Sequence, residues 1–109
     1  MARLSSGNIY AKIPKNIKHE IFEELFKGKN LNIHRILSHG QTTGWLKQYL
    51  DEWVILLEGS ATLFFEKKGR EIKLKSGDYI HIPKGCTHRV SWTDPKQKCV
   101  WLTVHYKNK

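Results

Sequence analysis

The sequence predicts an all-β protein, a sandwich or small barrel with one short helix near its N-terminus. Its 109 residues are enough for one domain with one modest core. From residue 31 onward, short segments rich in β-branched and aromatic residues alternate with turns that contain glycine, proline or aspartate. No long helical segments separate them, which argues against a parallel α/β fold. We therefore expect a single domain over residues 1–109, with a barrel core at 31–106 and an N-terminal extension at 1–30.

The helix is expected between residues 14 and 27. Apolar residues recur there at the spacing of one helix face. Asn16 would cap its start, and Gly28 follows its end. We expect this helix to pack against the outside of a sheet. Its apolar positions are Ile17, Ile21, Phe22, Leu25 and Phe26.

The rest of the chain divides into short expected strands. Glycine-containing turns such as 67–70 and 83–85 separate them. Short strands with frequent turns are typical of sandwiches and small barrels. The expected strands are 31–38, 45–49, 52–57, 61–66, 71–74, 79–82, 88–93 and 98–106.

The chain is basic, with a formal net charge of +9 from 19 basic and 10 acidic residues. Such a charge raises the question of nucleic acid or another anionic partner. The basic residues are scattered, however, and the sequence contains no arginine-rich run, helix-turn-helix pattern or zinc-finger spacing. We therefore expect the charge to form a solvated surface, and nucleic-acid binding is the least favoured of the functions considered.

The sequence also indicates a cytoplasmic setting. No stretch approaches the roughly 20 apolar residues that span a bilayer, and residues 1–7 lack the apolar core of a signal peptide. The two cysteines, Cys86 and Cys99, are too few for a disulfide framework, so we expect free thiols. A bridge between these two cysteines stays open at this point.

The segment 77–88 carries the clearest motif. Its fixed positions are Gly77, Pro83, Gly85 and His88. The order and spacing of these residues resemble the second motif of the cupin superfamily. The asparagine that follows in the family is absent, and Trp92 occupies its place.

Residues 52–59 resemble the second half of the first cupin motif, because Glu52 and Gly59 enclose six residues as in the family. The first half departs from the family. Two histidines are expected just before the glutamate, and neither is present in the stretch 45–48. Gln48 falls where the second histidine would sit if the gap is three residues. Over residues 31–106 the sequence is similar to short single-domain bacterial cupins with a glutamine in that place.

This resemblance implies a fold, a pocket and a partner. The fold is the cupin-type double-stranded β-helix, or jelly-roll barrel, and the pocket takes a small-molecule ligand. The default partner is a second copy, which makes a homodimer. The resemblance does not choose a chemistry, because cupins include dioxygenases, isomerases, epimerases, sensors and storage proteins.

Strand alternation brings the candidate site together if the barrel closes as in cupins. Glu52 and His88 would then point inward on neighbouring strands, and His105 would join them if it faces inward. Two imidazoles and a carboxylate can bind Fe(II), Mn(II), Ni(II) or Zn(II), and Gln48 could add a neutral oxygen. The alternative is a buried hydrogen-bonded pair of Glu52 and His88 without metal.

Further residues are expected to line the ligand pocket. The candidates are Tyr49, Trp92, Trp101 and Thr103. Rigid aromatic rings offer much contact area to a ligand. His34 could enter the barrel or face solvent, and alternation alone does not decide between these.

Two functions remain open on these residues. One is a metal-dependent enzyme of oxygenase or isomerase type that acts on a small organic molecule. The other is a small-ligand-binding or sensor protein with a degenerate metal site and no turnover. The missing histidines count against a metal, because an amide oxygen binds late transition metals more weakly than an imidazole does, but the two functions are weighed almost equally.

Overall fold

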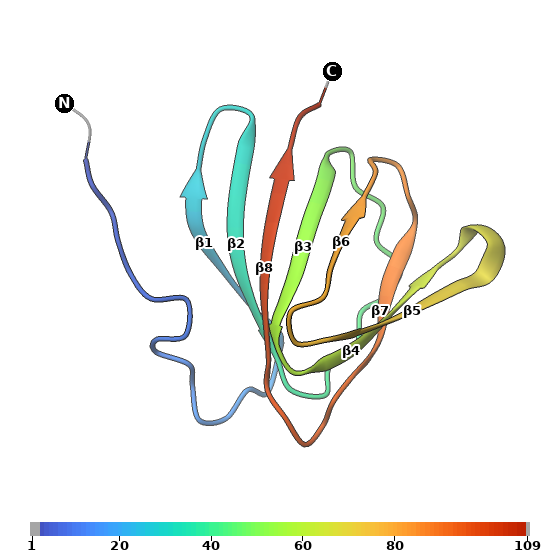
Figure 1. The fold of residues 1–109 in the computed structure, drawn as a ribbon, viewed down its shortest axis with the longest axis horizontal. Coiled ribbons are helices and arrows are strands. Elements are labelled where there is room, and N and C mark those ends of the chain that lie inside the picture. Colours follow the sequence, from blue (N-terminus) through green and yellow to red (C-terminus); the bar gives the residue numbers. More distant parts are fainter. Residues whose placement is uncertain (1–2, 109) are drawn as a thin grey trace.

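The computed structural model describes residues 3–108 and shows an all-β fold of two antiparallel sheets (Figure 1). The predicted fold class is therefore confirmed. The strands are β1 (Ile21–Lys27), β2 (Leu31–Ser38), β3 (Asp51–Glu58), β4 (Ser60–Phe65), β5 (Arg70–Lys75), β6 (Tyr79–Ile82), β7 (His88–Thr93) and β8 (Cys99–Tyr106).

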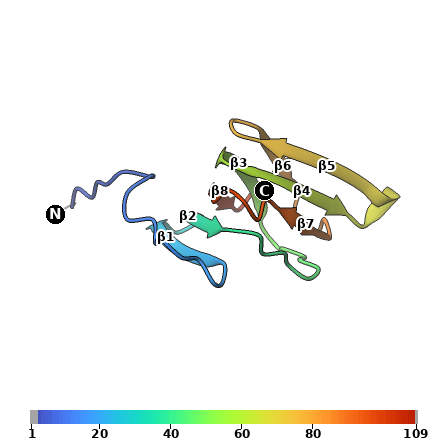
Figure 2. The same cartoon turned by 90° about the horizontal axis from the view of Figure 1, so that it is seen from below.

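One sheet has five strands in the order β1-β2-β8-β3-β6, and the other has three in the order β5-β4-β7. In Figure 1 the three-stranded sheet lies to the right of the five-stranded one. The N-terminal segment begins away from both sheets and leads from there to the start of β1, as Figure 2 shows from below. The chain crosses from one sheet to the other at Gly59, between β3 and β4. Gly59 has φ +101°, and a Cβ there would lie 2.6 Å from the sulfur of Cys99, so only glycine fits.

The predicted helix is wrong. Among residues 3–108 the only helical element is a 3-10 turn at Lys67–Gly69, so none is long and apolar enough to cross a membrane. Residues 21–27 form β1, which pairs antiparallel with β2. The apolar spacing fitted a helix, but pairing with β2 satisfies the backbone of a segment too short to be stable as a helix by itself. Phe22, Leu25 and Phe26 are exposed, so the segment has no buried helical face.

The predicted strand at 45–49 is also absent, apart from one isolated bridge between Leu46 and His88. This stretch belongs to a long loop between β2 and β3. The strands expected at 31–38, 79–82 and 88–93 have the predicted bounds. The strands expected at 52–57, 61–66 and 71–74 each differ by one residue at both ends. The strand expected at 98–106 begins one residue later.

The hydrophobic core lies between the two sheets. Its buried side chains include Val54 and Leu56 of β3, Leu63 of β4 and Trp101 of β8. Both cysteines are free, and burial raises the pKa of the Cys99 thiol. These inward side chains alternate with outward ones, so the same strands build an interior and an outer surface.

A second, smaller cluster holds the N-terminal segment against the outer face of the five-stranded sheet. Ile17 packs there with Leu37 and Val100. The buried guanidinium of Arg35 donates hydrogen bonds to the carbonyl oxygens of Ile9 and Ala11, at 2.9 and 2.6 Å. The segment before β1 therefore covers the sheet as expected of the helix, although it is not helical.

Candidate functional site

A cavity of about 100 Å³ lies between the two sheets. Strands of both sheets, residues just before and within β1, and the loop between β2 and β3 contribute to its wall. Six of the residues singled out in the sequence line it together. They are Gln48, Glu52, His88, Trp101, Thr103 and His105.

Glu52 is the centre of the polar wall. It is buried on β3, opposite His105 of β8 in the sheet register. Its Oε2 lies 3.6 Å from Nε2 of His105, and its Oε1 lies 3.8 Å from Nε2 of His88. His88 begins β7 in the other sheet, so this carboxylate connects the two sheets across the cavity.

The tautomer of His88 follows from its second nitrogen. Nδ1 lies 3.0 Å from the carbonyl oxygen of Cys86. A carbonyl only accepts hydrogen bonds, so Nδ1 carries the proton. In a neutral ring Nε2 then presents a lone pair toward the Glu52 carboxylate, which is also an acceptor. Two acceptors that face each other require a proton, a cation or a donor from a ligand between them.

Several polar atoms at this end of the cavity have no hydrogen-bond partner within the described chain. Leaving a buried polar atom unpaired costs on the order of 1–3 kcal/mol. These atoms come from β3, β8 and the loop between β2 and β3, and their residues all line the cavity, so one bound species could satisfy several of them. They are Gln48 Oε1, Glu52 Oε1, Thr103 Oγ1 and His105 Nε2.

Trp101 contributes an apolar wall, and its indole nitrogen donates to the Ser38 hydroxyl at 3.2 Å. Tyr49 and Trp92 do not line the cavity. Tyr49 is 87% exposed, because the loop turns Gln48 inward and its neighbour outward. A bulge reverses the alternation of β7: Val90 pairs with Leu63, whereas Trp92 pairs with Thr62. One residue of β7 is therefore left over, and the indole of Trp92 lies outside.

His34 lies on the interior side of the barrel wall. Its ring centroid is 6.1 Å from that of His105, and it shares a strand face with Ile36, which lines the cavity. His34 therefore faces the interior of the barrel, which strand alternation alone did not decide.

The sequence reasoning missed Glu20 and Phe22, which also line the cavity. Both lie in the segment expected to be a helix. Burial raises the pKa of the Glu20 carboxyl above its ordinary value. A strand assignment for 21–27 would have brought this segment to the barrel, but its apolar spacing concealed it.

The donor set matches the chemistry of a transition-metal site in residue type, with two imidazoles and one carboxylate. The unpaired atoms on Glu52 and His105 are consistent with a cation between them. Within residues 3–108, however, no three His, Cys, Asp or Glu side chains are already arranged to hold a metal ion. The residues fit a metal by type, and the side chains would have to close around it.

Comparison with known proteins gives a consistent result. The family model of the cupin domain matches residues 34–105. A crystal structure from Ralstonia eutropha, provisionally named a mannose-6-phosphate isomerase, is 38% identical over 96% of this chain and 100% of its own, with a TM-score of 0.91. No curated protein matches.

More distant structures share the fold alone. A cupin superfamily protein from Desulfitobacterium hafniense is 15% identical over 88% of this chain and 84% of its own, with a TM-score of 0.75. A polyketide cyclase from Streptomyces resistomycificus is 23% identical over 99% of this chain and 80% of its own, with a TM-score of 0.74.

Proposed function

The chain belongs to the cupin family, and on that premise we propose that it binds a small organic molecule together with a divalent metal ion at Glu52, His88 and His105. The observation that carries the proposal is the group of buried polar atoms without hydrogen-bond partners in the wall of the cavity, among them Glu52 Oε1 and His105 Nε2. With the proton on Nδ1, His88 Nε2 is a further acceptor at 3.8 Å from Glu52 Oε1. A cation between Glu52, His88 and His105 would pair these three groups.

The size and lining of the cavity limit the ligand. Its volume of about 100 Å³ is well below the roughly 300–1,000 Å³ of pockets for drug-sized molecules. The rest of the wall is largely apolar and includes Val54 and Trp101 from the sheet of Glu52 and Leu63 from the other sheet. A small molecule with one oxygen-rich end fits this arrangement, in which one part of the wall is polar and the rest is apolar. A larger one could insert only such an end.

The residues that would hold the metal are His88 and His105 through Nε2, and Glu52 through its carboxylate. A bound metal would polarise a carbonyl or hydroxyl oxygen of the ligand. If one oxygen of the Glu52 carboxylate binds the metal, its other oxygen can accept and return a proton at the same end of the cavity. An isomerase needs such a proton transfer, and the provisional name of the Ralstonia protein supports this reaction class.

Ligand binding without metal or turnover is the second candidate. Two observations favour it: Gln48 stands where the family has a histidine, and the described side chains form no ready-made metal group. In this version a hydroxyl or ammonium group of the ligand donates directly to Glu52. The two candidates therefore share the residue Glu52 and differ in what lies between it and the ligand.

The proposal includes a homodimer. β1 is an edge strand of the five-stranded sheet, and it exposes Phe22, Leu25 and Phe26. A second copy that pairs with this edge would cover those side chains and stand next to the cavity, since Phe22 lines it. We expect Leu25→Lys to convert a dimer to a monomer in sedimentation velocity and Tyr49→Ser to leave it intact. A monomeric wild-type protein would refute this part.

Thermal unfolding tests the binding function. Untagged protein is melted with Fe(II), Mn(II), Ni(II) or Zn(II), with sugar phosphates and small hydroxy or keto acids, and with pairs of these. A ligand at about 100 times its Kd stabilises the native state by about 2.7 kcal/mol, a measurable rise in melting temperature. We expect the rise in wild type and in Glu58→Gln, an exposed glutamate on the same strand, but not in Glu52→Gln. A rise that persists in Glu52→Gln would rule out the proposed anchor.

A further inference from the structure

A groove of about 550 Å³ lies on the outside of the three-stranded sheet, separate from the cavity. Thr62 at its centre pairs with Lys73 on β5 and with Trp92 on β7, so these three residues form one row across the sheet. Ser60 and Lys75 form the next row. We call this the outer groove; its lining is Ser60, Ala61, Thr62, Lys73, Leu74, Lys75, Asp78 and Trp92.

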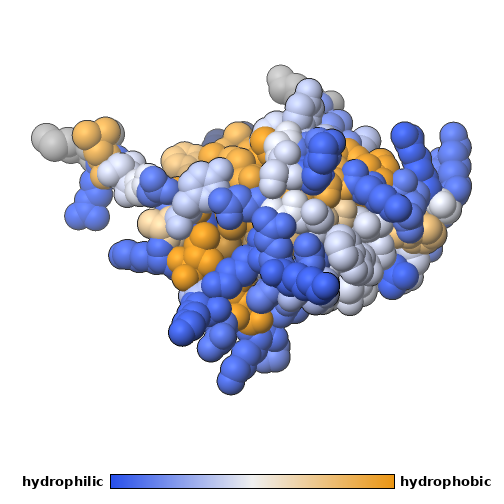
Figure 3. Space-filling view, turned by 60° about the horizontal axis from the view of Figure 1, so that its bottom comes forward, coloured by the Kyte–Doolittle hydropathy of each residue, from blue (hydrophilic) through white to orange (hydrophobic). Residues whose placement is uncertain are grey.

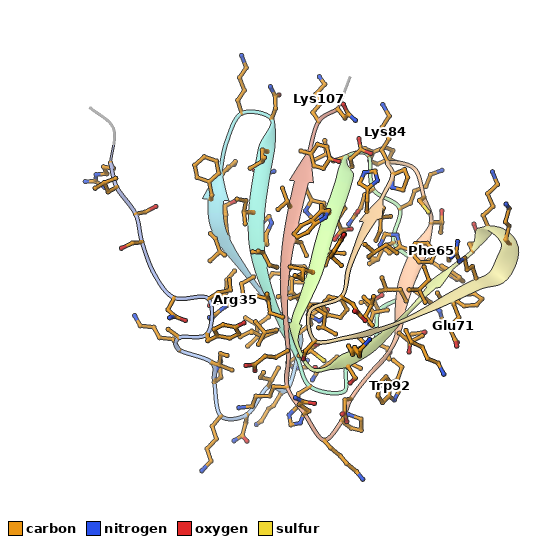
Figure 4. All side chains as sticks on the ribbon, viewed as in Figure 1. Arg35, Phe65, Glu71, Lys84, Trp92 and Lys107 are labelled. Carbon is orange, nitrogen blue, oxygen red and sulfur yellow. The ribbon has the colours of Figure 1, made fainter. Side chains whose placement is uncertain are left out.

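Trp92 is the unusual member of the outer groove. The bulge in β7 turns it away from the interior, and it is 44% exposed. Figure 4 shows it at the lower end of the three-stranded sheet. A tryptophan ring that is held by a strand and half exposed beside lysines offers a flat surface on which a planar ring can stack.

The same outer face continues to a second tryptophan. Phe64, two residues after Thr62, pairs with Arg89 of β7. The guanidinium of Arg89 lies over the ring of Trp45, 5.3 Å from its centroid, and Trp45 is itself 50% exposed. Two exposed tryptophans therefore lie on this face, and Trp45 packs against Phe64 and Arg89 there. A ligand with several successive rings can use both.

Positive charge surrounds the outer groove. Lys73 and Lys75 are exposed and lie about 7 Å apart along β5. The loop after β7 adjoins the groove, since the amide of Asp94 donates to the carbonyl of Ser60 at 3.0 Å, and it carries Lys96. Hydrophilic side chains project over much of this lower end of the molecule in Figure 3.

The charge extends to the N-terminal segment. The ammonium group of Lys98 donates to the carbonyl of Pro14 at 2.7 Å, which brings Lys15 to the same end. Two carboxylates of this region are fixed in turns: Asp78 accepts from the amide of Lys75 at 2.9 Å, and Asp94 from the amide of Lys96 at 2.8 Å. Asp78 also forms an exposed salt bridge with the ammonium group of Lys75 at 3.7 Å, and Glu71 lies on the same face opposite Phe64. Lysines still outnumber the carboxylates on this surface.

We propose that the outer groove binds single-stranded nucleic acid, with a base stacked on Trp92 and phosphates contacted by Lys73 and Lys75. Stacking platforms in a basic groove are the physical basis of binding to single strands. A duplex would not offer its bases, because they are stacked inside the helix. The basic residues were scattered along the sequence, and the fold gathers several of them beside an exposed aromatic ring.

The test is fluorescence anisotropy with a labelled dT12 oligonucleotide and the full-length protein. We expect binding at about 50 mM salt that weakens at about 150 mM, because phosphate contacts release counterions. Trp92→Ala should weaken binding about five- to 150-fold, which is the effect of losing one stacked base. Trp92→Phe should restore part of it, which separates stacking from any change in folding.

Charge is tested by a matched pair of double variants. Lys73→Ala with Lys75→Ala should lower the affinity for dT12 and flatten its salt dependence. Lys27→Ala with Lys29→Ala removes the same charge from the hairpin between β1 and β2 and should have little effect. Equal losses in the two double variants would mean that net charge alone attracts the oligonucleotide, and the site would be rejected.

Three further outcomes would also overturn the proposal. The first is the absence of a complex with dT12 at low salt. The second is equal binding of dT12 by wild type and Trp92→Ala. The third is equal affinity of the wild-type protein for dT12 and for a duplex of the same length. Inorganic polyphosphate serves as the control ligand without bases, and we expect its binding to be unchanged in Trp92→Ala.

Discussion

The cavity and the outer groove lie on opposite faces of the same three-stranded sheet. They differ in burial and in the kind of polar group that they present. The cavity holds buried polar atoms around Glu52 that have no hydrogen-bond partners within the described chain. The outer groove holds a surplus of donors on Lys73 and Lys75, in contact with water. Burial strengthens electrostatic interactions and salt screens exposed ones, so equal changes of charge should have unequal effects on the two faces.

The largest expected effect is on the cavity side. His88→Ala removes a nitrogen ligand, and we expect Zn(II) affinity to fall more than about 100-fold, because even the loss of a residue that orients a ligand costs roughly 10–100-fold. Isothermal titration of untagged protein measures this change. His19→Ala, an exposed histidine outside the cavity, is the matched control. Unchanged Zn(II) affinity in His88→Ala would contradict the assignment of His88 as a metal ligand in the cavity.

Two buried threonines of the interior differ in whether their hydroxyl groups have a hydrogen-bond partner. Thr103 Oγ1 has no partner within the described chain, whereas Thr93 Oγ1 donates to the carbonyl of Gln41 at 2.7 Å. We expect Thr103→Val to stabilise the ligand-free protein by about 1 kcal/mol and Thr93→Val to destabilise it by about 1 kcal/mol. Urea unfolding measures both values. The same sign for the two variants would contradict the claim that the cavity wall is unsatisfied.

A smaller effect is expected from Glu20, because it is only partly buried at the edge of the cavity. Burial raises its pKa in the folded state above the ordinary value of 4.5. Above pH 4.5 the unfolded chain releases this proton first, so stability falls with rising pH until the folded-state pKa is passed. Glu20→Gln should make the free energy of unfolding less dependent on pH in that window. An unchanged pH profile would show that the burial of Glu20 has no consequence.

The smallest effect on stability is expected in the outer groove. Lys73→Ala and Lys75→Ala should each change the free energy of unfolding by less than about 0.5 kcal/mol, because exposed charges contribute little and are screened. The salt bridge from Lys75 to Asp78, at 3.7 Å between exposed groups, is the interaction at risk. A loss above about 1 kcal/mol in urea unfolding would show that this face is structural.

Much of the fold could be predicted from local sequence. Strands such as 79–82 and 88–93 end at turn sequences, and a period of two fixes which side chains face inward. Glu52, His88 and His105 were brought together by that reasoning and by the resemblance to cupins. The structure places the three around one cavity, with 3.6 and 3.8 Å between the carboxylate and the two imidazoles.

The remaining features depend on contacts distant in sequence. The apolar spacing of residues 21–27 fits a helix better than a strand, and pairing with β2, which is not visible in the local sequence, overrides it. With that error Glu20 and Phe22 were lost from the cavity. Trp92 was misplaced by one bulge, which no propensity reveals and which reverses inside and outside at that point of β7.

The most direct test of the central claim is the metal content of untagged protein, measured by plasma mass spectrometry beside Glu52→Gln. The protein is first incubated with Fe(II), Mn(II), Ni(II) or Zn(II) and then freed of unbound ion. We predict close to one ion per chain in wild type and almost none in Glu52→Gln. A folded wild-type protein that takes up none of the four ions would contradict the metal-anchored account and leave direct binding of an organic ligand to Glu52.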